Sequence, residues 1–477
     1  MKRSKLLILV SVAVIAWGES KAQATAGTKT LRECIETAIA NNLDVKRSEL
    51  LSDQATIDLR QSRANLLPDL NANINHSNNS GRSIDPFTNS YITQSYSSAN
   101  YNLQSSVVLF NGFRLMNAIK QSALALEASK MEVQQAKDNL TLNVILTYLS
   151  VLTNNDLLTQ SRNQLELSTR QVERLEEMNK LGAIRPSDLS DLKGRLASDQ
   201  LAIINSQNSL NASRLQLAQL MNVPYDKDLA LEPVNIAQLD LGYSGDVDAI
   251  FQAAMQQLGI VKAANLRKES ATKGIQVARG ALYPTLFLSG GIGTNYSSVA
   301  TRETILSTID APTSAYVDIS GTHHPVLAPR NTVREDKISY GDQFKNNYGT
   351  SFGIGLQIPL LNNLQSRNRL SLAKIQEKNA DLVAKGMQIQ LKQLVEQAWF
   401  NMTAAQERYK TIIDQVAAFT ESFQAAEARF NAGSGTSIDY LTVKNSLDQA
   451  NINLIIARYD YLLRTKILDY YQGKPIW

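Results

Sequence analysis

The fold of this chain is decided by residues 391–433, which read LKQLVEQAWFNMTAAQERYKTIIDQVAAFTESFQAAEARFNAG. Apolar and small side chains recur there at seven-residue intervals in two rows. The first row is Val395, Met402, Tyr409, Val416, Phe423 and Phe430, and the companion row is Leu391, Ala398, Ala405, Ile412, Phe419 and Ala426. An unbroken double seam with a and d spacing is typical of a coiled-coil helix. The alanines of the companion row allow a neighbouring helix to approach closely.

Long intervals without proline contain this seam and an earlier counterpart. Residues 113–181 hold neither Pro nor Gly, and residues 364–432 hold only Gly386. Each interval is 69 residues long. At about 1.5 Å per residue, a continuous helix of that length reaches roughly 100 Å. The sequence therefore predicts two unusually long helices.

The two intervals belong to an internal repeat with an offset of 251 residues. Shifting the first apolar row back by this offset gives Val144, Val151, Leu158, Leu165 and Val172, and only the sixth position, Asn179, breaks the row. The turn at 182–188 then matches the turn at 433–439, and a further heptad row begins after each turn, at Leu189 and at Tyr440. Each half is thus predicted to form an antiparallel helical hairpin.

The division of the chain follows from this repeat. Upstream of the hairpins, Pro68 and Pro284 align at an offset of 216, so the larger offset further on places an insertion in the second half. We expect a first structural repeat at 25–222, a linker at 223–245 and a second repeat at 246–477. The insertion is rich in Thr, Ser, Gly, Asp and Pro, which predicts a long loop at 297–347.

Four short segments with a period of two interrupt the helical pattern, two in each half. Their apolar rows are Leu70, Ala72 and Ile74; Tyr101, Leu103, Val107 and Leu109; Leu286, Leu288 and Ile292; and Phe352, Ile354, Leu356 and Ile358. Strands of roughly ten residues with one apolar and one wet face fit a transmembrane β-barrel. Four strands cannot close a pore, but three copies would supply twelve. The alternative is a small soluble β-layer that caps a helical bundle.

Residues 1–24 have the pattern of a secretory signal peptide, with an apolar run from Leu6 to Trp17 and the small-residue site Ala22-Gln23-Ala24. An uncleaved anchor helix is the alternative, but the apolar run is well short of the ~20 residues that a span requires. The full chain has 48 basic and 44 acidic residues. Removing four basic residues and one acidic residue with this segment leaves 44 and 43. No basic footprint for nucleic acid remains.

The sequence contains no motif for catalysis or for a cofactor. A P-loop, a nucleophile elbow and an HExxH motif are all missing from it. The pair His323-His324 could bind a metal, but no Cys or acidic cluster stands at ligand spacing, which favours an exposed pair in a loop. The single cysteine, Cys34, indicates packing. We expect neither an enzyme nor a cofactor site.

The order helix, strand, loop, strand, long helix, Gly-containing tip and return helix occurs twice and resembles the TolC-like outer-membrane efflux protein family, the outer membrane factors. The strand exits Leu109-Phe110-Asn111-Gly112 and Leu360-Leu361-Asn362-Asn363 add to the resemblance. It implies a mainly α-helical chain with a transmembrane β part, in which long antiparallel coiled-coil hairpins form an α-barrel tunnel. Four strands per chain would contribute to a twelve-stranded barrel of a homotrimer, and the loop at 297–347 would be extracellular.

The resemblance also implies the function and the partners. Members of the family are passive exit ducts in the outer membrane that extend into the periplasm, as parts of tripartite efflux or type I secretion systems. Their partners are a periplasmic adaptor (membrane fusion) protein, an inner-membrane pump and outer-membrane lipid. The runner-up interpretation is a soluble periplasmic helical-hairpin adaptor or scaffold protein, which would use the same heptads and keep its strands out of lipid.

In this family the periplasmic aperture carries aspartates near the second tip, in a pattern like Gly-x-x-x-x-x-Asp-x-x-Asp. Gly433 and Asp439 match this pattern. Thr442 stands at the second acidic position, and Gly435 replaces the basic residue expected two positions after the glycine. The resemblance therefore implies a single ring of three carboxylates.

Two further acidic residues, Asp188 and Asp191, lie at the first tip and share one helical face. They add to the candidate aperture. A simpler role remains open, because Asp188 and Asp439 each follow a turn, where a carboxylate stabilises the start of a helix.

Adaptor hairpins meet the duct at the tips in this family. The resemblance thus implies adaptor contacts at Gly182, Arg185, Pro186, Gly433 and Gly435. Arg185 fits equally well as an exposed turn residue before a proline.

Overall fold

The computed structural model describes residues 28–84, 89–93, 95–182, 184–234 and 245–474. The expected signal peptide at 1–24 lies outside these residues, as do positions 235–244 of the expected linker. The chain divides into two compact units. The helical unit contains the described residues up to Arg47, Gln134–Leu258 and Gln390 onward, and the sheet unit contains Ser48–Val133 and Gly259–Ile389.

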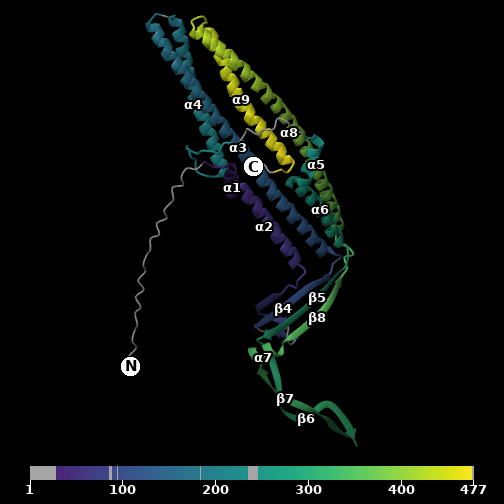
Figure 1. Ribbon diagram of the computed structural model, residues 1–477. Helices are drawn as coiled ribbons and strands as arrows, with labels where there is room; N and C mark the ends of the chain where they lie inside the picture. The colour runs from purple at the N-terminus through teal and green to yellow at the C-terminus, as the bar shows by residue number, and fades with distance from the viewer. Residues whose placement is uncertain (1–27, 85–88, 94, 183, 235–244, 475–477) are drawn as a thin grey trace, which may run out of the picture. The chain divides into compact units, whose positions relative to one another are not determined.

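Helices make up most of the chain, and their bounds repeat between the halves (Figure 1). The first half contains α1 (Leu31–Asn41), α2 (Leu43–Ala64), α3 (Arg114–Lys180) and α4 (Pro186–Met221). The second half contains α5 (Val247–Gln257), α6 (Gly259–Gly280), α8 (Gln365–Asn431) and α9 (Ser437–Tyr471). α3 and α8 have 67 residues each and are offset by 251 positions. The two long helices predicted from the sequence are confirmed, each one residue shorter at either end.

The predicted seam forms the core of the helical unit. Its buried members include Val144, Val151, Leu158, Val172, Leu391, Val395, Met402 and Ala405. Further along the α8 rows, Tyr409, Ile412 and Val416 are only half-buried within one chain. Fully burying a large apolar side chain contributes about 1.5–3 kcal/mol, so each buried member of the seam stabilises this unit.

Cys34 belongs to the same core. It lies in α1 and is fully buried, and this burial raises the pKa of its thiol to about 11. The thiol therefore stays protonated at neutral pH and is a packing group.

Among the helices that the structure describes, none has an apolar stretch long enough to cross a membrane.

The sheet unit is built on a four-stranded antiparallel sheet with the order β1-β4-β5-β8. Its strands are β1 (Asn71–Asn79), β4 (Tyr96–Phe110), β5 (Thr285–Ser297) and β8 (Gly349–Gln357). They coincide with the four alternating segments of the sequence. A short ribbon of β2 (Arg82–Ile84) and β3 (Tyr91–Thr93) lies between β1 and β4 along the chain.

The register sorts the side chains of this sheet onto two unlike faces. Residues paired directly, such as Ala72 with Leu103 and Leu103 with Ile292, point to the same side. That apolar face carries Ile74, Leu103, Ile292, Phe352, Ile354 and Leu356, all of which are at least 40% exposed. The opposite, polar face carries Asn71, Asn73, Asn102, Gln104, Ser289 and Ser351. The alternation predicted from the sequence is thus present across all four strands.

The connection between β5 and β8, expected as a long loop at 297–347, is largely regular. It contains the hairpin of β6 (Thr301–Ile319) and β7 (Thr322–Lys337), and then α7 (Tyr340–Asn346). Ser320 and Gly321 make the turn with φ values of 54° and 85°, the backbone that a tight two-residue hairpin turn requires. The Thr, Ile and Val residues of β6 and β7 favour extended strands, although the segment as a whole is polar and contains proline. The connection expected as a long loop therefore consists largely of a β-ribbon followed by a short helix.

Candidate aperture and docking site at the hairpin tips

Each hairpin turns at a glycine with a left-handed backbone. Gly182 follows α3 with a φ of +69°, and Gly433 follows α8 with a φ of +73°. Only glycine adopts this conformation without steric cost, which explains its place just beyond a helix. Pro186 is the first residue of α4, where its missing N–H is not needed.

Asp439 lies in the first turn of α9 and completes its N-terminal cap. The backbone N–H of Asp439 donates to Thr436 Oγ1 (3.1 Å), and the Thr436 hydroxyl donates to Asp439 Oδ2 (2.8 Å). The side chain of Asp439 is nevertheless exposed. Asp439 therefore combines a capping role with an exposed negative charge.

Thr442 is also exposed, one turn further along α9. Its hydroxyl donates to the backbone carbonyl of Ile438 (2.8 Å), as a helical threonine commonly does. Thr442 is neutral, so it adds no second negative charge beside that of Asp439.

The acidic residues of the first tip contact the second tip. Ser437 Oγ lies 2.9 Å from Asp188 Oδ1 and 3.3 Å from Asp191 Oδ2. The Ser437 hydroxyl has one hydrogen to share between these two acceptors. The structure therefore brings Asp188 and Asp191 together at the buried start of α9.

A pocket of about 330 Å³ lies between the two tips. Arg185, Asp188, Gly433 and Gly435 line it, and Met178 and Phe430 add apolar surface. Four residues expected from the sequence to act at the tips thus share one cavity.

A buried apolar cluster holds the helices beneath this pocket. Val172, Leu175, Leu192, Phe423 and Tyr440 form it, contributed by both hairpins. The Tyr440 ring stacks 4.9 Å from the ring of Phe430 and lies 5.6 Å from that of Phe423. Burial raises the pKa of the Tyr440 phenol above its usual range, so this group stays neutral. The tips therefore rest on a well-packed support.

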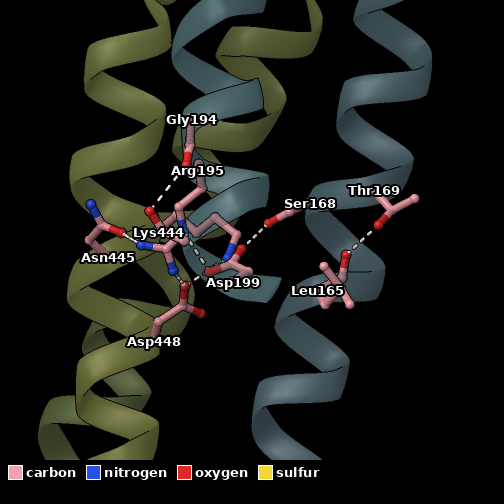
Figure 2. A network of polar contacts seen from close by, with 10 residues as sticks. Leu165, Ser168, Thr169, Gly194, Arg195, Asp199, Lys444, Asn445 and Asp448 are labelled. Atoms are coloured by element: carbon pink, nitrogen blue, oxygen red, sulfur yellow. Dashed lines mark hydrogen bonds and ion pairs between the residues drawn. The ribbon is translucent and has the colours of Figure 1, made fainter. Parts of the chain in front are cut away.

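A network of charged residues also joins the two hairpins (Figure 2). Asp448 of α9 accepts hydrogen bonds from Lys444 Nζ and from Arg195 of α4, each at 2.7 Å. Arg195 Nε also lies 2.9 Å from an oxygen of Asp199. Lys444 is only 1% exposed and Asp199 only 2%. The charges of two positive and two negative side chains therefore neutralise one another in this network.

Polar neighbours extend this network to a third helix. Ser168 of α3 donates to Asp199, and Arg195 donates to Asn445 (Figure 2). The network consequently links α3, α4 and α9 at one level of the helical unit.

The sequence prediction missed this network, although two signals for it exist. Asp199 stands three residues after Leu196, in a second heptad row of α4 whose other members are apolar or small: Leu192, Ser206, Ser213 and Leu220. Lys444 and Asp448 are four residues apart, which places them on one helical face. The charged network could have been inferred from these two signals together. One return helix carries a charge at a seam position, and the other carries an ion pair.

The histidine pair of the sequence lies on the β6–β7 ribbon. His323 is exposed and pairs with Asp318, and its ring lies 4.3 Å from that of Tyr316. Across the part of the chain that the structure describes, no group of three or more His, Cys, Asp or Glu residues could hold a metal ion.

Similar proteins share this architecture. The outer membrane efflux protein family matches residues 34–223 and 251–471. The outer membrane protein TolC of Escherichia coli strain K12 is 22% identical over 438 residues, which cover 91% of this chain and 80% of that protein. TolC of Vibrio cholerae is 24% identical over 446 residues, with coverage of 91% and 88%. The solved structure of the outer membrane protein VceC from Vibrio cholerae matches with a TM-score of 0.73 at 16% identity, covering 94% of this chain and 97% of that one.

These matches extend over nearly the whole chain. They confirm the expected fold class, with long helical hairpins and strands of an outer-membrane channel. They do not favour the soluble adaptor or scaffold, and they agree with a duct that is not an enzyme. The chain belongs to the outer membrane efflux protein family and is an efflux duct of the outer membrane.

Proposed function

We propose that the chain works as a homotrimer in which three copies surround one passive channel. The observation that carries this proposal is the four-stranded sheet, with one apolar and one polar face and with β1 and β8 at its ends. End strands in lipid need partners for their backbone groups. Pairing β8 of one copy with β1 of the next satisfies both edges, and three sheets supply twelve strands. The half-buried α8 row at Tyr409, Ile412 and Val416 supports the same assembly, since a neighbouring helix would cover it.

Native mass spectrometry of the detergent-solubilised protein is expected to show particles of three chains. The physical reason is the edge pairing, which a single sheet cannot provide for itself. The control is the soluble fraction of the same cells, lysed without detergent. Recovery of the native chain there as a monomer, or a monomer in detergent, would overturn the trimer.

We further propose that the exposed Asp439 side chains form a ring at the periplasmic aperture, near Thr442, Asp188 and Asp191. A symmetric ring of three carboxylates raises the local cation concentration and disfavours anions. The Thr436 cap supports this role because it fixes the backbone that carries the charge. The duct supplies no energy of its own in this proposal, so transport is driven by an inner-membrane pump.

The pocket between the tips is proposed to receive a helical hairpin tip of a periplasmic adaptor. Arg185, Gly433 and Gly435 line it, and Gly182 and Pro186 shape the adjoining turn. The pocket presents Arg185 and Asp188 beside apolar walls, which suits a partner that offers a carboxylate or backbone carbonyls to Arg185 next to a small apolar side chain.

Cysteine cross-linking in cell envelopes tests this docking. Arg185→Cys is expected to yield an adduct with a peptide from the hairpin tip of a periplasmic adaptor, identified by mass spectrometry. The reason is that residue 185 lines the pocket. The native thiol gives little background because Cys34 is fully buried.

The matched control for this experiment is Lys180→Cys. Lys180 is a basic, exposed residue near the same tip, but it pairs with Glu177 outside the pocket lining. Equal adducts from positions 180 and 185 would show that the pocket has no special role in docking.

A further inference from the structure

The apolar face of the sheet carries a groove beside α7. It has a volume of about 290 Å³ and spans β1, β4 and β5. Ala72, Ile74, Leu103 and Ile292 form its floor on the strands, and Phe344 and Tyr348 form its wall. The groove is therefore walled on one side by a segment that the repeat does not predict.

Hydrogen bonds hold α7 firmly over the sheet. Gln343 is 1% exposed, and its Nε2 donates to the carbonyls of Ser297 and Ile338, each at 2.9 Å. Its Oε1 accepts from the Ser297 backbone N–H, also at 2.9 Å. Thr294 Oγ1 donates to the carbonyl of Phe344 (2.9 Å). The groove is thus a preformed feature of the fold.

Aromatic side chains close one end of the groove. The Tyr101 ring meets the Phe344 ring edge-to-face at 5.6 Å, and the Tyr340 hydroxyl donates to the Tyr101 hydroxyl at 2.9 Å. Tyrosines of this kind are common where a membrane surface meets water. The groove therefore joins an apolar floor to a polar rim that carries tyrosine hydroxyls.

We propose that this groove binds one acyl chain of a membrane lipid. The groove is continuous with the apolar face of an outer-membrane protein, so lipid is the medium that meets it. Cargo would pass along the polar face. The floor of the groove and its α7 wall belong to one chain. A second copy that pairs at the β1 edge would therefore lie beside the groove and would not fill it.

The dimensions favour a single chain. Ligand pockets span about 300–1,000 Å³, and this groove lies at the small end of that range. Within lipid there is no hydrophobic driving force, so binding depends on close packing. An unfilled void would forfeit dispersion contacts along its lining. A lipid tail held in this groove would exchange more slowly than its neighbours in the bilayer.

Native mass spectrometry in nanodiscs of phosphatidylglycerol tests this site. The native protein is expected to retain about one lipid for each chain through mild activation, because each groove has room for one tail. Ile292→Trp fills the groove and is expected to abolish the retained lipid. The number of lipids is counted for each chain, and a monomer would also retain one lipid. The result therefore does not depend on whether the protein is a trimer.

Ile354→Trp is the matched control. Ile354 lies on the same apolar face and is 66% exposed, but it stands on β8 outside the groove. Phe344→Ala removes the α7 wall without changing a strand and is expected to lose the lipid too, which guards against a folding defect of Ile292→Trp. Equal retention by the Ile292→Trp and Ile354→Trp proteins, or no retained lipid in the native protein, would overturn the proposal.

Discussion

Replacing Asp448 by alanine is expected to lower the free energy of unfolding of the helical unit by about 3–5 kcal/mol. The substitution leaves Lys444, which is 1% exposed, without its carboxylate partner, and it removes one partner of Arg195. An uncompensated buried ammonium is far costlier than a lost surface ion pair. Denaturant unfolding of the detergent-solubilised protein, followed by helical circular dichroism, measures the change.

Two comparisons separate this effect from a general response to lost charge. Glu166→Ala breaks an i,i+4 pair with Arg170 in which both side chains are more than 60% exposed, so a change within about 0.5 kcal/mol is expected. The double substitution Lys444→Met with Asp448→Leu removes the stranded ammonium and is expected to restore most of the stability. Equal losses for Asp448→Ala and Glu166→Ala would refute the structural importance of the network.

The network also bears on how the two hairpins are aligned. Apolar heptad seams tolerate a shift of one helix along another, because each layer resembles the next. Arg195 of α4 and Asp448 of α9 lie 2.7 Å apart, and a shift of one helix along the other would separate these two largely buried charges. We infer that the network fixes the register of α4 against α9 and so sets the height of the two tips.

The sequence was sufficient to predict the long helices and the four strands. α3 and α8 were found within one residue at each end because, apart from Gly386, proline and glycine are missing from both helices and occur in the segments that flank them. The strands were found because a face that alternates at period two is legible in residues such as Ile354 and Leu356. Local periodicity and local breakers determine both features.

The parts that were missed depend on contacts distant in sequence or on weak local preferences. Lys444 and Arg195 look like ordinary solvated charges until α4 and α9 are packed together. The β6–β7 ribbon has mixed composition, and its two strands are stabilised by each other rather than by a legible apolar face. α7 is only seven residues long, and its Gln343 holds it in place through hydrogen bonds to Ser297 and Ile338, which lie outside the helix.

The candidate site was predicted in part. The family resemblance assigned Gly433 and Asp439 to the second tip, and the structure places a left-handed glycine and a capped first helical turn there. The contact of Ser437 with Asp188 and Asp191 was not foreseen, because it joins residues about 250 positions apart. A ring made by several copies of Asp439 remains a prediction for the assembly.

Asp439→Asn is expected to shift the reversal potential of the reconstituted channel under a salt gradient toward zero. The amide retains an oxygen that can accept from Thr436, so the cap persists while three negative charges leave the proposed ring. Loss of the charge at the helix start costs only about 0.3–1 kcal/mol, too little to unfold the tip. Purified protein in planar bilayers, bathed in unequal potassium chloride solutions, provides the measurement.

Thr436→Ala is the converse control. It removes the hydroxyl that caps α9, at about 0.5–2 kcal/mol, but keeps the carboxylate. Cation selectivity should therefore survive in Thr436→Ala and fall in Asp439→Asn. Thr442→Asp adds a second carboxylate one turn along the same exposed face and should raise selectivity above that of the native channel. If Asp439→Asn and Thr442→Asp both leave the reversal potential unchanged, ions do not pass a constriction at Asp439, and its role is confined to the helix cap.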